Sequence, residues 1–429
     1  MSFSREDHIK YFKHCLAGLP GDYVELDTQR IVLLYFCVLG LDILGGLSSL
    51  SPEEEKSILD FVHKNHLHLT VNDMKTQGFV GSPFTGQPAK FLPEDSGEGQ
   101  SAYCSSSYWQ SHLAMTYSGL AILAAFNQTI TVSMREEVLN SVRLCARPDG
   151  SFSCTPSYAH YHPNNPYGDG EADVRFVYCA CVISALCYPG SGAEAGTGTA
   201  VPWALILDAA MVSTYIRSCQ GYEGGFGLNP GSEAQGGATY CAVASLALLG
   251  RLDDLGADNR CRLEAWCLRR QVSGYSGRTN KAPDSCYSFW IGGTLALLGA
   301  FQLTDMPSTK TYLLQSCQFM INFAVNLDKT DEEKAAEAAR SSAEEAETCA
   351  PVDAPAVMNY CTRCGFCKLP HYPPDVLHTF YSLAWLSMAG NSCGFGSGEG
   401  DATTDTECRA LRAFHPLTGL CVDRGLSVR

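Results

Sequence analysis

Residues 274–290, GYSGRTNKAPDSCYSFW, combine side chains that bind metals with side chains that bind anions. Arg278 and Lys281 are two cations, and Asp284 and Cys286 follow them, separated by one residue. A carboxylate oxygen together with a cysteine sulfur suits zinc better than magnesium or calcium. The apolar run that follows predicts a helix, whose N-terminus favours anions through its free N–H groups and its dipole. The segment therefore predicts half of a metal site beside an anion pocket; the alternative is a helix cap followed by a core cysteine.

The composition is typical of a large globular protein. The chain has 429 residues, 45% of them apolar, which is enough for a sizeable core. The net charge of -15 argues against a nucleic-acid partner, which would need a basic face. The longest apolar run near the start, residues 31–41, is too short to cross a membrane, and no signal peptide is visible. Because 21 cysteines occur without such a signal, we expect free thiols and a cytoplasmic protein.

A glycine-aromatic turn followed by an apolar helix recurs along the chain. The turns lie at 77–82, 148–152, 223–227, 273–278 and 364–368. The apolar helices that follow them start at about 114, 174, 238, 285 and 377. A helix that is apolar all round must be buried, so we expect each repeat to pair it with an amphipathic outer helix. Five or six such pairs would close into an all-α α/α barrel, with the turns gathered at one end of a central cavity.

Three low-complexity stretches interrupt this pattern. They lie at about 189–201, 322–360 and 394–411, where small or charged residues dominate. The third precedes a short terminal tail. Because such compositions do not build a packed core, we expect loops or solvated insertions within one barrel domain that spans residues 1–429.

Two segments resemble the β subunits of protein prenyltransferases, and most of all the type I geranylgeranyl class. They are PDSCYSFW at 283–290 and PDVLHTFYSL at 374–383, and the similarity extends from about residue 5 to 390 outside the insertions. The resemblance implies an α/α barrel in which Asp284, Cys286 and His378 hold one zinc ion. It also implies the reaction, in which zinc keeps the cysteine of a C-terminal CaaX tail as a thiolate that attacks a prenyl diphosphate.

The same resemblance assigns the leaving diphosphate to a cluster of polar side chains. Arg278, Lys281 and the Tyr287 hydroxyl match the diphosphate binders of the family and would stabilise the negative charge that develops there. The family carries a histidine in an E-x-H-G-G segment, but this chain reads EAQGG, so Gln235 offers a hydrogen bond without a charge. Lys368 stands where farnesyltransferases bind magnesium through an aspartate, which implies that magnesium is not required here.

The residues expected along the lipid mostly follow the geranylgeranyl pattern. A small residue in the second helix leaves room for a twenty-carbon chain where farnesyltransferases carry a tryptophan. The positions that match the geranylgeranyl class are Val32, Phe36 and Leu377. Tyr381 instead follows the farnesyl class. Trp290 and Tyr178 are expected to line the lipid wall, although each also fits an ordinary core position.

Peptide recognition would use one histidine and one ion pair. His112, Glu171 and Arg175 match the family residues that hold the peptide terminus, and a guanidinium group suits a carboxylate. A Glu171–Arg175 pair also fits a purely structural role. In the family an α subunit completes the peptide site, so we expect a heterodimer and an inactive isolated chain.

A second candidate metal motif lies near the last repeat. Cys361, Cys364 and Cys367 form CxxCxxC, but no fourth ligand follows at a spacing that suits zinc. The motif also coincides with a glycine-aromatic turn, so buried structural cysteines are the simpler interpretation.

Taken with the resemblance, these features predict the catalytic β subunit of a zinc-dependent protein geranylgeranyltransferase type I. Its substrates would be geranylgeranyl diphosphate and proteins with CaaX tails, such as Rho-type small GTPases. One alternative is a farnesyltransferase β subunit, against which Val32 and Lys368 argue. The other is a non-catalytic barrel that binds without turnover, for which Gln235 is the main support.

Overall fold

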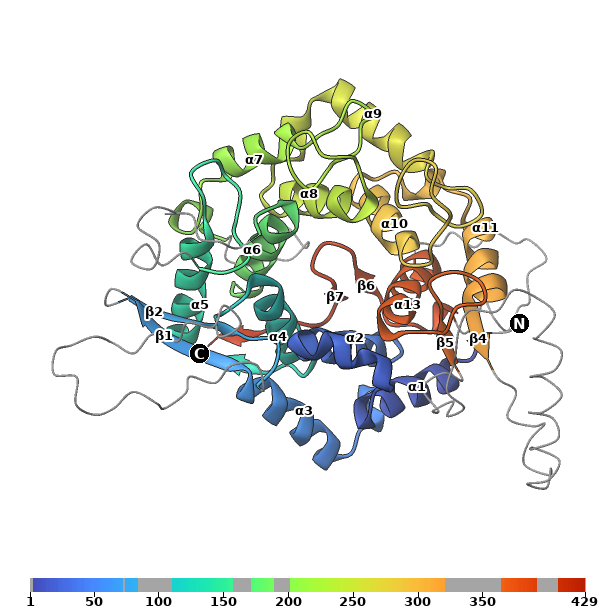
Figure 1. Cartoon of the computed structure of the whole chain (residues 1–429), viewed down its shortest axis with the longest axis horizontal. Coiled ribbons are helices and arrows are strands. Elements are labelled where there is room, and N and C mark those ends of the chain that lie inside the picture. The colour runs from blue at the N-terminus through green and yellow to red at the C-terminus, as the bar shows by residue number, and fades with distance from the viewer. Residues whose placement is uncertain are drawn as a thin grey trace.

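Six inner helices form a closed ring in the part of the chain that the structure describes. The computed structural model describes residues 3–71, 74–83, 110–156, 171–188, 201–320, 364–391 and 408–428. Each inner helix packs on the next, and the last packs on the first (Figure 1). They are α2 (Arg30–Ile43), α4 (Leu113–Ala125), α6 (Val174–Leu186), α8 (Gly236–Leu248), α10 (Tyr287–Leu297) and α13 (Val376–Asn391). The predicted all-α α/α barrel is therefore confirmed.

The outer helices bury one face against the ring and expose the other. They are α1 (Arg5–Ala17), α3 (Pro52–Lys64), α5 (Val132–Cys145), α7 (Ala209–Ser218), α9 (Ala257–Leu268) and α11 (Met306–Thr311). In α3, Ile58 and Val62 are buried, whereas Glu53 is exposed. The helix begins with a capping box in which Ser51 and Glu54 each bind a backbone N–H group of the other. Local capping and one apolar stripe thus explain how this layer forms.

The inner helices all begin at the same end of the ring. A backbone N–H group at five of these helix starts donates to a carbonyl oxygen in the turn of the next repeat. The bonds are Ile31 to Gly81 (3.0 Å), Leu113 to Cys154 (2.8 Å), Val174 to Leu228 (3.1 Å), Gly236 to Gly277 (2.9 Å) and Ser285 to Lys368 (3.0 Å). Polar residues at the helix starts are therefore brought together, as the repeat pattern predicts.

Short strands, which the sequence pattern does not predict, connect the helices. Strand β1 (His66–Val71) pairs antiparallel with β2 (Met74–Phe79), and β4 (Gln318–Met320) pairs antiparallel with β5 (Cys364–Phe366). Near the C-terminus, β6 (Phe414–His415) and β7 (Leu420–Cys421) form a hairpin that lies inside the ring (Figure 1). Strand β8 (Ser427–Val428) then pairs in parallel with β3 (Thr129–Ile130). The end of the chain is thus part of the barrel and not a separate tail.

The predicted low-complexity stretches lie almost entirely outside the described residues. This applies to 189–200, to all of 322–360 and to 394–407, whereas residue 201 and residues 408–411 are described. Among the helices that the structure describes, none has the length and apolarity needed to cross a membrane.

Candidate metal centre and anion pocket

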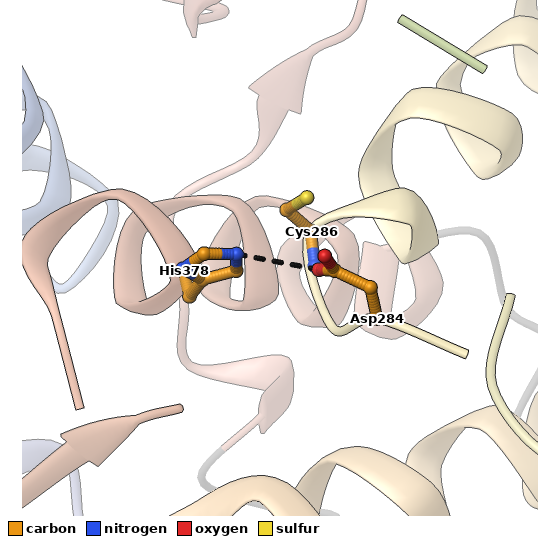
Figure 2. Close-up of side chains that lie close together, drawn as sticks. All are labelled: Asp284, Cys286 and His378. Carbon is orange, nitrogen blue, oxygen red and sulfur yellow. Dashed lines mark hydrogen bonds and ion pairs between the residues drawn. The ribbon is translucent and has the colours of Figure 1, made fainter. Parts of the chain in front are cut away.

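The predicted metal ligands Asp284, Cys286 and His378 meet at the end of the ring where the inner helices begin. Asp284 and Cys286 lie in the turn that leads into α10, and His378 is the third residue of the neighbouring helix α13. Their potential ligand atoms all lie within 4.8 Å of one another. Nε2 of His378 is 3.3 Å from Oδ1 of Asp284, and Figure 2 shows the Cys286 side chain beside this pair. One oxygen, one sulfur and one nitrogen converge, which is a donor set that can hold a metal ion.

The turn before α10 is tied to the turn that carries Lys368. Oδ1 of Asp284 accepts a hydrogen bond from the Cys286 N–H group at 3.1 Å, which keeps the two ligands together. The intervening residue, Ser285, is fully buried. Its Oγ donates to the Cys367 carbonyl at 2.7 Å, and its N–H group donates to the Lys368 carbonyl at 3.0 Å. The backbone of Lys368 is therefore fixed next to the metal ligands.

Asp375 orients His378, a role that the sequence pattern alone did not reveal. Oδ2 of Asp375 lies 2.5 Å from Nδ1 of His378, and its Oδ1 accepts from the His378 backbone N–H group at 2.9 Å. With Nδ1 bound to Asp375, Nε2 is the ring nitrogen that faces Asp284. Carboxylate partners of this kind fix the tautomer and the ring orientation of metal-binding histidines. The available signal was an aspartate three residues before the histidine at a helix start, where an N-cap is expected.

The charges in this cluster fit a site in which a cation replaces protons. Burial lowers the pKa of His378, but hydrogen bonds to Asp284 and Asp375 outweigh burial and raise that pKa to about 9. Burial likewise opposes ionisation of Asp284, yet the bond to His378 holds its pKa below the usual value. Burial and the Asp284 carboxylate raise the pKa of the Cys286 thiol well above its usual range. A bound cation would reverse this last shift, because it stabilises the thiolate.

The two predicted cations lie on an exposed turn beside the metal ligands. Nη1 of Arg278 is 3.3 Å from Oε2 of Glu233, and Lys281 is exposed. The Tyr287 ring packs so closely on Gly277 that a Cβ atom there would lie 2.0 Å from the ring. Burial raises the pKa of Tyr287 to about 12, so its hydroxyl stays protonated at neutral pH. Two cations and one hydroxyl donor are thus available to an anion.

A chain of polar side chains that starts at a buried arginine supports this cationic turn. Arg270 is buried, and its guanidinium carbon lies 5.2 Å from the centre of the Trp266 ring. Nη1 of Arg270 donates to Oγ1 of Thr279 at 2.9 Å, and Thr279 donates to Glu223 at 3.1 Å. Because Thr279 directly follows Arg278, these bonds fix the backbone that presents the first cation. Arg270 follows α9 and Glu223 lies in the preceding repeat, so no local sequence pattern indicated these bonds.

Gln235 directly precedes α8 and flanks the same turn. The N–H group of the next residue, Gly236, donates to the Gly277 carbonyl at 2.9 Å, and Glu233 pairs with Arg278. The Gln235 side chain does not cap its helix, so its amide can serve a ligand. This position is compatible with a place in the anion pocket, which stays a prediction.

Comparison with known proteins places the chain in one family. A sequence model of the prenyltransferase alpha-alpha toroid domain matches residues 3–331 and 352–420. The chain belongs to this family. The geranylgeranyl transferase type-1 subunit beta of Arabidopsis thaliana is 34% identical over 328 residues, covering 74% of this chain and 78% of the relative. The protein farnesyltransferase subunit beta of Schizosaccharomyces pombe is 30% identical over 335 residues, covering 74% and 71%.

The geranylgeranyl transferase type-1 subunit beta of Dictyostelium discoideum is 31% identical over 319 residues, covering 72% of this chain and 81% of the relative. Among solved structures, the Candida albicans protein geranylgeranyltransferase-I complexed with GGPP superposes with a TM-score of 0.66. It covers 99% of this chain and 97% of that chain at 22% identity, and therefore shows the shared fold. The predicted membership among prenyltransferase β subunits is confirmed.

Aromatic rings cover the interior of this prenyltransferase barrel next to the metal ligands. The ring centroid of Trp290 lies 4.4 Å from that of Tyr381 and 5.1 Å from that of Tyr240. Tyr240 lies 5.4 Å from Tyr178, and Phe36 lies 5.7 Å from Tyr381. Three of the predicted lipid-lining residues therefore pack in a row, Phe36, Tyr381 and Trp290, and Tyr178 joins them through Tyr240. The other two, on α2 and α13, each keep part of their surface exposed: Val32 and Leu377.

The predicted peptide-binding residues lie at the starts of α4 and α6. Nδ1 of His112 accepts from the Ala114 N–H group at 3.2 Å and so caps α4. Burial and the nearby Arg175 charge lower the pKa of His112 to about 4, which makes it neutral at neutral pH. Arg175 pairs with Glu171 at 3.1 Å and also with Asp173 at 2.6 Å. The sequence pattern missed Asp173, which already neutralises Arg175. This supports the interpretation that the Glu171–Arg175 pair is structural.

The CxxCxxC motif gains no support as a metal site. Cys361 lies outside the described residues, and Cys364 and Cys367 are buried. Sγ of Cys367 donates to the Cys317 carbonyl at 2.9 Å. Within the described ranges, the Asp-Cys-His cluster at the start of α10 is the one group of three side chains placed to share a metal ion.

Proposed function

We propose that this chain is the catalytic β subunit of a zinc-dependent protein geranylgeranyltransferase type I. The observation that carries the proposal is the convergence of Asp284, Cys286 and His378 beside an aromatic-lined barrel interior. The relatives described above are β subunits of protein prenyltransferases, and two of them are of the type-1 geranylgeranyl class. With an α subunit, the chain would transfer a geranylgeranyl group from geranylgeranyl diphosphate to the cysteine of a C-terminal CaaX motif.

The donor set fits zinc. Zinc favours four ligands that include sulfur and nitrogen, whereas magnesium and calcium favour oxygen. Asp284, Cys286 and His378 would hold it and leave one position for a substrate sulfur. Bound zinc supplies a Lewis acid that lowers the pKa of a coordinating cysteine thiol. Asp375 would keep the proton of His378 on Nδ1 and so leave Nε2 available to bind the metal.

The cationic turn would stabilise the leaving diphosphate. Arg278 and Lys281 bring full positive charges, and the Tyr287 hydroxyl brings a donor whose proton is retained at neutral pH. Donors aimed at developing negative charge are each worth roughly 100- to 1,000-fold in rate. Lys368, whose backbone is bound to Ser285 in the metal turn, would supply the charge that magnesium supplies in farnesyltransferases.

The same proposal covers the partners and surroundings of the chain. An α subunit would complete the peptide site, and the protein substrates would carry CaaX tails, as Rho-type small GTPases do. Reaction in the cytoplasm would suit the free thiols that the structure places in the barrel wall. We also infer one barrel domain over residues 1–429, with low-complexity stretches at about 189–201, 322–360 and 394–411.

Co-expression with a type I α subunit tests the proposed function. The purified heterodimer is given farnesyl and geranylgeranyl diphosphate in competition, with peptides that end in leucine or in serine or methionine. We expect geranylgeranyl transfer to the leucine-ending peptide to dominate. Absence of transfer in a zinc-loaded heterodimer would instead support the non-catalytic barrel.

The farnesyltransferase alternative is favoured by one observation. Tyr381, which follows the farnesyl class, packs directly on Trp290 with a centroid separation of 4.4 Å and on Phe36 at 5.7 Å. Its hydroxyl adds bulk to the interior surface where the geranylgeranyl class has phenylalanine. A dominant farnesyl product in the competition would support this alternative.

Replacing Asp375 with asparagine is expected to weaken zinc binding and activity by about 10- to 100-fold, as removal of an outer partner of a metal ligand usually does. The carboxylate that fixes Nδ1 of His378 is lost, while the three ligands remain. Zinc content after dialysis against a graded chelator measures the effect. Asp305→Asn, which alters a helix cap on the outer layer, is the matched control. Zinc retention equal to that of the unaltered protein would contradict the role of Asp375.

Replacing Gln235 with histidine is expected to raise the affinity for the diphosphate by up to about tenfold, because a charged donor forms a stronger hydrogen bond than an amide. The gain should be larger at pH 6 than at pH 8, since histidine is protonated below its usual pKa of about 6.5. Binding of geranylgeranyl diphosphate at the two pH values measures it. Gln235→Glu should weaken binding at both pH values. If the affinity is unchanged in Gln235→His and in Gln235→Glu, Gln235 lies outside the pocket.

A further inference from the structure

We propose that Cys317 and Cys367 form a redox-sensitive dithiol behind the metal ligands, which a peroxide converts into a disulfide that slows prenyl transfer. The modification site goes beyond the proposed function, although its effect on transfer rests on that function. Cys367 belongs to the CxxCxxC motif, which neither the metal cluster nor the anion pocket uses. Cys317 lies 50 positions earlier in the chain, at the end of the segment that follows α11.

The pairing of two strands places these cysteines opposite each other. Strands β4 and β5 lie side by side in antiparallel orientation (Figure 1), with Gln318 opposite Phe366. One step further along this ladder Cys317 lies opposite Cys367, and the Cys367 N–H group donates to the Cys317 carbonyl at 2.9 Å. Opposite residues in such a ladder have Cα atoms about 4.5–5.5 Å apart, and disulfides span Cα separations of about 4.4–6.8 Å. The backbone therefore already holds the two residues at a separation that a disulfide bridges.

The two side chains also meet. Sγ of Cys367 donates to the Cys317 carbonyl at 2.9 Å. The two thiols form a further hydrogen bond with each other, which raises the pKa of Cys317 and lowers the pKa of Cys367. Side chains that point apart cannot be joined without backbone movement, whereas these two thiols are already in contact. Cys367 is the thiol that reacts first with an oxidant, because the thiolate is the nucleophile.

The reaction is a two-electron oxidation in which hydrogen peroxide is the oxidant. The Cys367 sulfur attacks one peroxide oxygen, the O–O bond breaks, and a sulfenic acid forms while one water leaves with the proton that the thiol released. The Cys317 sulfur then attacks the Cys367 sulfur, so that the S–S bond forms and the S–O bond breaks. A second water leaves with the proton of the Cys317 thiol. A dithiol reductant reverses the oxidation by thiol–disulfide exchange.

Burial restricts the oxidants that reach this pair. Cys317 is fully buried, and Cys367 is 3% exposed. The rate of thiol oxidation depends on access as well as on thiolate character. Hydrogen peroxide is only slightly larger than water, whereas oxidised glutathione is a disulfide of two tripeptides. We therefore expect the pair to respond to peroxide and not to oxidised glutathione.

The Cys367 half of the pair is bonded directly to the turn that carries the metal ligands. The Cys367 carbonyl accepts from Oγ of Ser285 at 2.7 Å, and the carbonyl of Lys368 accepts from the Ser285 N–H group at 3.0 Å. Ser285 lies between Asp284 and Cys286. A shift of the backbone at Cys367 is therefore transmitted to both ligands.

The Cys317 half reaches the same turn through a tyrosine. Tyr312 begins the π-helical segment η6 (Tyr312–Cys317), and its side chain forms a hydrogen bond with the Cys317 thiol. The Tyr312 hydroxyl donates to the carbonyl of Pro283 at 2.8 Å, directly before Asp284. Two hydrogen bonds thus connect the Cys317 sulfur with the backbone of the metal turn.

Disulfide formation would change both connections. The two sulfurs must approach to about 2 Å, and neither thiol keeps a proton to donate. The Cys367 sulfur then loses its hydrogen bond to the Cys317 carbonyl, and the contact between Cys317 and Tyr312 is altered. A displacement of about 1 Å in a catalytic site can lower the rate about 100-fold. For the smaller shift expected here, we expect kcat to fall by about tenfold.

The test exposes the zinc-loaded heterodimer with the α subunit to hydrogen peroxide. Free thiols are then alkylated, and peptides are mapped by mass spectrometry without reduction. We expect a linked peptide pair that contains Cys317 and Cys367, a fall in kcat of about tenfold, and recovery of both states with dithiothreitol. Zinc content should stay unchanged, which separates this effect from oxidation of Cys286. Oxidised glutathione in place of peroxide should produce no link.

Cys317→Ser cannot form the link but keeps a hydroxyl that makes similar hydrogen bonds. Its kcat without peroxide should therefore lie within about twofold of the unaltered protein and should not fall after peroxide. Cys267→Ser, on the buried face of α9, is the matched control and should lose activity as the unaltered protein does. If Cys317→Ser does not assemble, Cys317→Ala takes its place.

Three results would overturn the inference. In the first, Cys317 and Cys367 stay unlinked after peroxide, or Cys367 links to Cys364 instead. In the second, the linked heterodimer transfers the prenyl group as fast as the reduced one. In the third, the Cys317 variant is inactivated as strongly as the Cys267 control. A reduced, unaltered heterodimer that transfers no prenyl group would overturn the proposed function, whereas the peptide map would still report whether the disulfide forms.

Discussion

Replacing Cys286 with serine is expected to abolish stoichiometric zinc binding and to lower kcat by more than about 100-fold. This loss is larger than the roughly 10- to 100-fold loss that usually follows removal of a residue that only orients a metal ligand. A serine hydroxyl is a poor zinc ligand, whereas the buried thiol can be held as a thiolate once a cation is bound. His378→Ala should have the same effect, because it removes the only nitrogen ligand of the cluster within the described residues. Metal analysis of the purified heterodimer and single-turnover transfer measure both results.

Binding of the lipid separates this effect from unfolding. The aromatic wall and the cationic turn are untouched in Cys286→Ser, so affinity for geranylgeranyl diphosphate should stay within about twofold of the unaltered protein. Cys267→Ser, in the buried face of α9, is the control for placing a hydroxyl at a buried cysteine position. Full transfer activity in Cys286→Ser, or zinc retained in equal amount, would contradict the assignment of the metal ligands.

The barrel and the metal ligands were predictable because their signals are local. An apolar run that must be buried, repeated after each glycine-aromatic turn, indicates inner helices whose starts lie at one end. Asp284 and Cys286 are separated by one residue in one such turn, and His378 begins the next inner helix. Asp284 and Cys286 could therefore be placed from their own segment, whereas His378 was assigned as the third ligand by the resemblance of its segment to the prenyltransferase family.

The parts that were not predictable depend on contacts between distant segments. Tyr117 donates to the Thr418 carbonyl across 301 positions of sequence, and Asp42 pairs with Arg424 across 382. Strands β6 and β7 have two residues each, too short for an alternating pattern to be visible. The hairpin therefore resembled a terminal tail in sequence, although Phe414, Leu420 and Cys421 are buried. A buried Asp42 at the end of an apolar helix was the one local indication that distant cations must approach.

Under the proposed function, replacing Lys368 with aspartate is expected to make prenyl transfer depend on magnesium. The Lys368 carbonyl accepts from Ser285, which lies between two metal ligands, so the exposed Lys368 side chain begins at the mouth of the site. There an ammonium group can neutralise diphosphate oxygens directly, whereas a carboxylate can do so only through a bound cation. Without magnesium, kcat of Lys368→Asp should fall by about 100-fold, the size expected for loss of one donor to developing charge.

Millimolar magnesium should restore most of this loss in Lys368→Asp but not in Lys368→Ala, because alanine provides no ligand for the cation. The measurement is transfer by the heterodimer in chelator-treated buffer with zinc restored and magnesium varied. Lys56→Asp, on the exposed face of α3, reverses the same charge far from the site and should leave the magnesium response flat. A strict magnesium requirement in the unaltered heterodimer would show that the Lys368 ammonium does not take the place of the metal, and it would shift the assignment toward the farnesyl class.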